Sequence, residues 1–166
     1  MGDRFEIQPS DLLTNVPGLR KTLRVTAIEG DVVELNHGAL VMTALGALVK
    51  NKQGTYDPPY GGYPVEFQVG KSWSGRATLQ THDGEVHELQ RSSKIVARET
   101  ITVPAGTFHT YVIEVSAFVN QRSQIIKLWI DPRYGQPIKS EVMARKGARI
   151  VRSDREELAA INAPRS

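Results

Sequence analysis

Four histidines are the first residues to consider as metal ligands or acid–base groups. His37, His82, His87 and His109 are scattered along the chain, and three of them lie in or next to predicted turns. A hairpin turn at Asp83-Gly84 could bring His82 and His87 together, but a zinc site also needs a third and a fourth ligand in a set geometry. The chain has no cysteine, which excludes disulfides, thiolate metal sites and cysteine nucleophiles. We therefore predict solvated turn histidines, no metal site and no cofactor.

Several carboxylates could line one side of a sheet together with basic residues. They are Glu85, Glu88, Glu99, Glu114 and Glu141, with Arg98, Lys127 and Lys139. Cross-strand ion pairs on a solvated face account for this pattern without acid–base catalysis. Glu114 has the best case for a chemical role, because apolar neighbours flank it. No phosphate-binding loop, dinucleotide glycine pattern or G-x-S-x-G elbow occurs, so we predict no catalytic residue and no enzyme.

Aromatic side chains are the candidates for holding a ligand. They are Tyr56, Tyr60, Tyr63, Trp73, Phe108, Tyr111, Phe118 and Trp129. The three tyrosines lie within residues 50–63, which Pro58-Pro59 and Gly61-Gly62 interrupt, so we expect a long ordered loop there. Such loops often carry binding residues, and a tyrosine combines an apolar ring with a polar tip. Two interpretations stay open: the tyrosines cap the sheet edge, or they form the lip of a ligand site. Trp73 is likewise either part of the core or a recognition ring.

The elements that would position these residues are strands. Tyr111, Ile113, Val115, Ala117 and Val119 fall on one face of a period-two pattern, while Thr110, Glu114 and Ser116 fall mainly on the other. A hairpin at Pro104-Ala105-Gly106 precedes this strand, and a turn from Asp131 to Gly135 follows the next apolar run. The stretch from Arg98 to Glu141 therefore predicts a three-stranded antiparallel meander.

The rest of the chain continues the same pattern. We expect an irregular arm or a short edge strand over residues 1–18, one antiparallel β domain over 19–161, and a flexible tail over 162–166. Ser153-Asp154-Arg155-Glu156 matches a capping box and predicts a short helix to about Ile161. The predicted fold is mainly β: a single curved antiparallel sheet of about eight to eleven strands, shaped as a half-barrel or clam, with one short C-terminal helix.

Composition limits the classes of partner. The chain has 166 residues, of which 40% are apolar and 23% charged, as in one ordinary globular domain. Its net charge of +3 is spread along the chain with no basic block, so we expect no nucleic acid. The longest apolar run, Ala39 to Val49, is about half of what a membrane-spanning helix needs. No signal peptide is visible, because Met1-Gly2-Asp3-Arg4 opens into polar sequence.

Three short motifs carry a resemblance to known proteins. They are Gly70-Lys71-Ser72-Trp73, then Val103-Pro104-Ala105-Gly106-Thr107-Phe108, and Leu128-Trp129-Ile130-Asp131-Pro132 followed by Gly135 and Pro137. Together they resemble a group of uncharacterised bacterial envelope proteins, many of them lipoproteins, over about residues 63 to 145. The last motif is also similar to lipoprotein carriers of the Lol type, whose curved sheet cups an acyl chain. The resemblance implies a periplasmic or outer-membrane-attached location, with a natural leader that precedes this chain, and no catalytic residue.

Two hypotheses for function follow, and a third is weaker. The first is a non-catalytic envelope domain that holds a lipid, an acyl chain or an acylated partner on a concave sheet. It is favoured by apolar residues on both faces of neighbouring strands: Ile125, Ile126, Leu128, Trp129 and Ile130 occupy five of six positions, and Phe108, Val112 and Phe118 lie opposite the Tyr111 face. The second is an interaction or scaffolding module of an envelope complex, whose extra apolar groups are covered by a partner protein or by the chain itself as a closed barrel. The third, a hydrolase acting on envelope material, would need a polar cleft.

Overall fold

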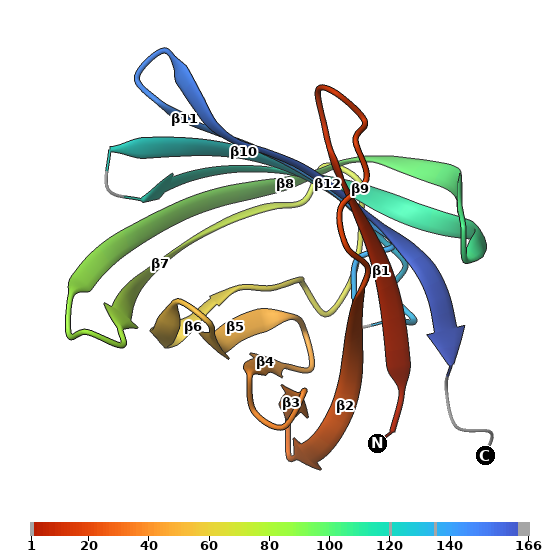
Figure 1. Cartoon of the computed structure of the whole chain (residues 1–166), viewed down its shortest axis with the longest axis horizontal. Helices are drawn as coiled ribbons and strands as arrows, with labels where there is room; N and C mark the ends of the chain where they lie inside the picture. The colour runs from red at the N-terminus through yellow and green to blue at the C-terminus, as the bar shows by residue number, and fades with distance from the viewer. Residues whose placement is uncertain (1, 120, 135, 163–166) are drawn as a thin grey trace.

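The chain forms a closed antiparallel β-barrel in the computed structural model, which describes residues 2–119, 121–134 and 136–162 (Figure 1). The described residues contain twelve strands and no helix. The strands are β1 (Arg4–Asp11), β2 (Lys21–Glu29), β3 (Val32–Leu35), β4 (Leu40–Thr43), β5 (Ala47–Asn51), β6 (Gly54–Gly61), β7 (Ser72–Thr81), β8 (Val86–Val103), β9 (Gly106–Val119), β10 (Arg122–Ile130), β11 (Lys139–Lys146) and β12 (Arg149–Asn162).

Each strand pairs with the next one along the chain, and the ring is closed where β1 pairs with both β2 and β12. Strands β7 to β11 form one broad curved wall, and strands β3 to β6 lie across from it (Figure 1). The predicted half-barrel, with eight to eleven strands, is therefore wrong. Closure depends on pairing between the two ends of the chain, from Arg4↔Asn162 to Asp11↔Asp154, and a local sequence pattern does not encode such long-range contacts.

The predicted C-terminal helix is also wrong. Residues 149–162 form β12, which is paired with β11 on one side and with β1 on the other. A capping box contributes about 1 kcal/mol to a helix, whereas two ladders of backbone hydrogen bonds hold this segment extended. Leu158 is buried in the resulting strand, and Ser153 pairs with Met143 of β11.

The N-terminal residues also differ from expectation. Arg4–Asp11 forms β1, a strand paired on both sides, in place of an irregular arm or an edge strand. Residues 12–20 then connect β1 to β2. Of the predicted tail, residue 162 ends β12, and 163–166 lie outside the described residues. The described part of the chain contains no helix long and apolar enough to span a membrane.

The predicted loop over residues 50–63 is largely a hairpin. β5 ends at Asn51, and β6 runs from Gly54 to Gly61. Gly54 permits the turn because its φ is +153° and a Cβ there would lie 2.0 Å from the carbonyl oxygen of Gln80. Pro58 and Pro59 are accommodated at the end of the strand, beyond its last pair with β7.

Side chains pack in three apolar clusters. The large cluster consists of Phe5, Ile7, Val25, Leu35, Val103, Phe108, Ile138 and Leu158. The wall cluster consists of Ile95, Ile113, Val115, Leu128 and Ile130. The tyrosine cluster consists of Tyr56, Tyr60, Ala77, Leu79 and Leu89.

The meander predicted around β9 is confirmed, and so is the burial of Ile113, Val115 and Ala117. Near its middle, however, β9 is buried on both faces, because Val112 and Ile113 are each 1% exposed. β8 has a bulge at Val96, opposite this point, where the buried face of the hairpin changes. The apolar pattern on both faces thus reflects two clusters packed on opposite sides of one strand.

Candidate functional site

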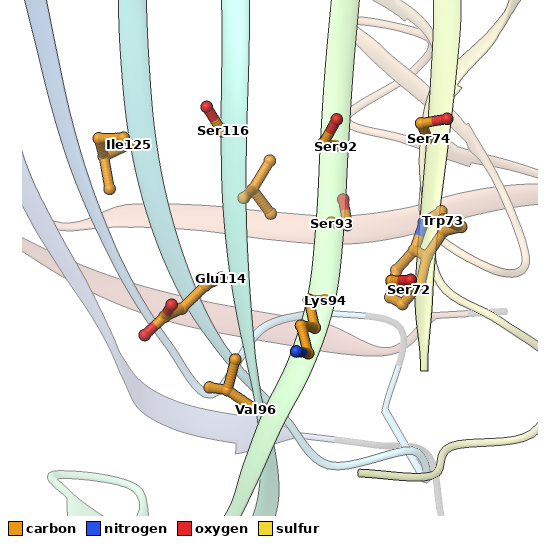
Figure 2. A pocket seen from close by; sticks show the side chains of 11 residues that line it. Ser72, Trp73, Ser74, Ser92, Ser93, Lys94, Val96, Glu114, Ser116 and Ile125 are labelled. Carbon is orange, nitrogen blue, oxygen red and sulfur yellow. The ribbon is translucent and has the colours of Figure 1, made fainter. Parts of the chain in front are cut away.

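The face of β7 to β10 that is turned away from the wall cluster carries a shallow cavity of about 580 Å³ (Figure 2). We call it the outer groove. Register places Ser74, Ser92, Ser116 and Ile125 in one row across four neighbouring strands. Figure 2 shows this row along one side of the groove, with Ser72, Lys94 and Glu114 along the other. Small serine side chains leave room above the sheet, while neighbouring positions carry longer side chains.

A row of alternating charge crosses the sheet beside these serines. Register aligns Lys94, Glu114, Lys127, Glu141 and Arg155 on five successive strands. Glu141 is the best-satisfied member, because its Oε2 accepts a hydrogen bond from Arg155 Nε at 3.2 Å and lies 4.0 Å from Lys139 Nζ. Opposite charges side by side on neighbouring strands stabilise the sheet modestly and leave both signs available to a partner.

A second cavity of about 410 Å³ continues the first one across the sheet. Ile125 lines both cavities, and Leu12 and Met143 provide the other apolar side chains of the second. Leu12 comes from the β1–β2 connection, where its N–H donates to the carbonyl oxygen of Ser153. The connection is held by Asp11, whose Oδ1 accepts backbone hydrogen bonds from residues 13 and 14, and these bonds lower the pKa of the carboxyl.

Ile125 and Phe118 are the exposed apolar side chains of this region. Ile125 is 61% exposed and Phe118 is 59% exposed. Register puts Ser116 beside Ile125 and Ser123 beside Phe118, so the two apolar residues lie on the same face of the sheet. Two large apolar side chains exposed next to each other on one face of a sheet form a patch of the kind that a partner buries.

The aromatic residues predicted to bind a ligand do not form one site. Tyr56, Tyr60, Phe108 and Trp129 are buried, in three different places. Tyr56 and Tyr60 stack with ring centroids 6.0 Å apart, and Trp129 is covered by Lys127 and Lys139, whose Nζ atoms lie 5.0 and 4.7 Å from its ring. All four side chains therefore contribute to packing and are not accessible to a ligand.

Of the other four predicted aromatics, Phe118 is exposed, and Tyr63, Trp73 and Tyr111 are partly buried. Tyr63 and Tyr111 flank Phe67 over the wall cluster, with centroids 6.3 and 5.2 Å from the Phe67 ring. Burial raises the pKa of Tyr63 to about 12. Trp73 lines the outer groove, and Phe118 lies beside it on β9. Sequence reasoning missed the serines and Leu12, because a period-two pattern marks serine only as a solvent-facing residue.

The predicted turn after β10 is present and is fixed by an ion pair. Asp131 is buried, and its carboxylate accepts hydrogen bonds from Arg133 Nε at 3.0 Å and from Arg133 Nη2 at 2.6 Å. Burial raises the pKa of Asp131, but the hydrogen bonds and the charge of Arg133 lower it by more, so the net shift is downward. Gly135 lies outside the described residues.

The chemical candidates stay apart from one another. His82 is an exposed turn residue, while the Nε2 of His87 lies 3.2 Å from Glu85. Glu114 is exposed and lines the outer groove. Within residues 2–119, 121–134 and 136–162, no group of three histidine, aspartate or glutamate side chains could hold a metal ion.

Solved structures of candidate exported proteins and lipoproteins have a fold similar to this one, whereas no family model matches the chain and no curated protein matches it in sequence. A candidate exported protein with a YmcC-like fold from Bacteroides fragilis is 13% identical and superimposes with a TM-score of 0.62, over 98% of this chain and 96% of that one. A candidate lipoprotein from Parabacteroides distasonis is 11% identical, with a TM-score of 0.60 over 97% and 95% of the two chains.

The hypothetical lipoprotein YmcC from Escherichia coli also has a similar fold. It is 15% identical, with a TM-score of 0.59 over 98% of this chain and 85% of YmcC. At such low identity the likeness shows a common fold. The descriptions of these structures agree with the resemblance to uncharacterised envelope proteins, while the similarity to Lol-type carriers stays a prediction from the sequence.

Proposed function

We propose that this protein is a non-catalytic domain of the bacterial cell envelope that binds an extended segment of a partner protein in the outer groove. The observation that carries the proposal is the exposure of Ile125 and Phe118 beside two connected cavities on one face of the barrel. The envelope location is supported by the fold neighbours, which are described as exported proteins or lipoproteins.

The lining of the groove favours a polypeptide over an acyl chain. Ser74, Ser92 and Ser116 present hydroxyl groups that can donate to and accept from a peptide backbone, and Lys94 and Glu114 offer one charge of each sign. A hydrocarbon chain would cover these polar groups without replacing their hydrogen bonds to water, at a cost for each of them. An extended peptide can place an apolar side chain against Ile125 and satisfy the polar groups around it.

The size of the apolar contact can be estimated from Ile125. Complete burial of an isoleucine side chain stabilises by roughly 1.5–3 kcal/mol, and 61% of this one remains exposed. A partner that covers it gains about 1–2 kcal/mol, which corresponds to roughly 5- to 30-fold in affinity.

Site-specific photocrosslinking in cells tests the proposal. A photoreactive phenylalanine replaces Ser116 in the groove or, as a matched control, Val86, which is 62% exposed at the start of β8. We expect one discrete protein adduct from position 116, lost in the Ile125→Asp background, and no such adduct from position 86. An adduct that survives Ile125→Asp contradicts the proposal. A lipid that copurifies with the wild type and is lost in Ile125→Asp would replace it with the acyl-chain hypothesis.

A further inference from the structure

The barrel wall contains a gap where β6 and β7 stop pairing. Their backbone pairs run from Gly54↔Thr81 to Asp57↔Thr78 and end where Pro58 and Pro59 follow. Proline has no N–H, so it cannot continue the ladder to β7. A cavity of about 160 Å³ lies in this gap, lined by residues 58–61 of β6, 73–76 of β7, and two side chains of β8. A volume of this size accommodates a small ion or a few water molecules.

Arg91 is the first of the two β8 residues that line the cavity. Its Cζ lies 5.7 Å from the centroid of the Tyr60 ring, and its Nη1 lies 2.6 Å from where a Cβ on Gly61 would be. The guanidinium is therefore packed between an aromatic ring and bare backbone. Its Nε is buried without a hydrogen-bond partner, and no ion pair or side-chain hydrogen bond among the described residues involves the Arg91 guanidinium.

This isolation has an energetic cost. Burial lowers the pKa of Arg91, because the charged guanidinium loses hydration that no nearby carboxylate replaces. The lining of the cavity includes a second, exposed arginine, Arg76, and no acidic residue. The gap is thus a locally positive site with a half-buried cation at its base.

Ser93 is the second β8 residue in the cavity, and it is also unsatisfied. It is 4% exposed, and its Oγ has no hydrogen-bond partner in the described part of the chain. Two residues apart on one strand, Arg91 and Ser93 point to the same side of the sheet. A buried donor without a partner is destabilising, so two of them lining one small cavity point to a missing acceptor.

We propose that this cavity binds a small oxyanion, a carboxylate or a phosphate group, through Arg91 and Ser93, with Tyr60 and Trp73 as its walls. Water could accept hydrogen bonds from the two donors, but only an anion also compensates the charge of the guanidinium. Charge-assisted hydrogen bonds from arginine to carboxylate or phosphate are among the strongest in proteins. The site is separate from the outer groove, except that Trp73 lines both cavities.

Titration of the ¹⁵N-labelled full chain with sodium acetate and, separately, with sodium phosphate tests the site, with ionic strength held constant by sodium chloride. The readout is the indole N–H signal of Trp73, assigned with Trp73→Phe, and Trp129 is the internal reference. We expect a saturable shift of the Trp73 signal with at least one of the two anions, and a rise in Tm with the same concentration dependence. A response to acetate alone identifies a carboxylate site, and a response to phosphate alone identifies a phosphate site.

Three variants establish which side chains hold the anion. Arg91→Met should abolish the shift, and Ser93→Ala should weaken binding roughly 10- to 100-fold through loss of one charge-assisted hydrogen bond. Arg98→Met is the matched control, because Arg98 lies on the same strand and stacks on Tyr111 at 5.1 Å outside the cavity. It should bind like the wild type. Should Arg91→Met fold poorly, Arg91→Lys keeps the charge and should bind more weakly than wild type.

Two results would overturn the proposal: no saturable shift with either anion, or equal binding by the wild type and the folded Arg91 variant. The groove variant Ile125→Asp should retain the anion response. Failure of one proposal therefore leaves the other intact.

Discussion

Replacement of Leu158 with alanine is the most direct test of barrel closure. Leu158 lies in β12, is 1% exposed, and packs in the large cluster that includes Phe5 and Ile7 of β1. Its backbone N–H donates to Ile138 and its carbonyl accepts from Ala105, so the strand cannot easily move to fill the space. Truncation of a buried leucine costs about 2–5 kcal/mol, and a site bounded on all sides cannot collapse fully, so we expect a loss of about 3–4 kcal/mol.

Urea unfolding followed by far-UV circular dichroism measures this change. With a slope of about 2 kcal/mol per M, the loss lowers the unfolding midpoint by roughly 1.5–2 M at an unchanged slope. Leu19→Ala is the control, since Leu19 is 91% exposed and its truncation should stay within about 0.5 kcal/mol. A Leu158→Ala variant that unfolds like Leu19→Ala would refute the placement of β12 against β1.

Three further outcomes are expected. Gly54→Ala should destabilise by roughly 2–4 kcal/mol in urea unfolding, because its Cβ would meet the carbonyl oxygen of Gln80, whereas Gly84→Ala, with open space around it, should cost about 1 kcal/mol. The stability difference between wild type and Asp131→Asn should be complete above about pH 5 and shrink as the pH falls below the unfolded-state pKa of about 3.9, because the folded pKa is lowered. Tyr63→Phe should remove the phenol that ionises near pH 12 in an absorbance titration.

Each of these has a clear contrary result. Equal effects at the two glycines would argue against the close approach of β6 to β7. A difference at Asp131 that grows on acidification would contradict the downward pKa shift, because the ionised carboxylate is the form that Arg133 stabilises. If Tyr63→Phe still contains a phenol that ionises near pH 12, the hydroxyl whose pKa is raised belongs to another tyrosine.

The strand pattern of the sequence was informative where one face of a strand is buried. The alternation through Ile113, Val115 and Ala117 correctly predicted the central strand and its neighbours. It could not reveal that Val112 is equally buried, because that depends on a second cluster brought to the opposite face by other strands. Local signals also failed at Ser153 to Glu156, where a capping box is overridden by pairing on both sides.

The candidate site was less predictable than the fold. Tyr56, Tyr60 and Phe108 were predicted to bind a ligand only because they are aromatic, and all three are buried in apolar clusters. The apolar run that begins at Ile125 did indicate an exposed apolar residue, since it contains more apolar residues than one buried face of a strand needs. The residue of this run that stays exposed depends on the register between β10 and β9, which the run itself does not determine.

The proline pair at the end of β6 has a consequence for how this molecule opens. A complete ring of strands has no free edge, but here the hydrogen-bonded ladder between β6 and β7 spans only four residue pairs, against nine between β7 and β8. Thermal breathing should therefore open this seam more readily than the β7–β8 ladder, and amide hydrogens there should exchange with solvent before those of β8 and β9. The same weak seam provides a way for a solute to enter the wall without unfolding of the whole domain.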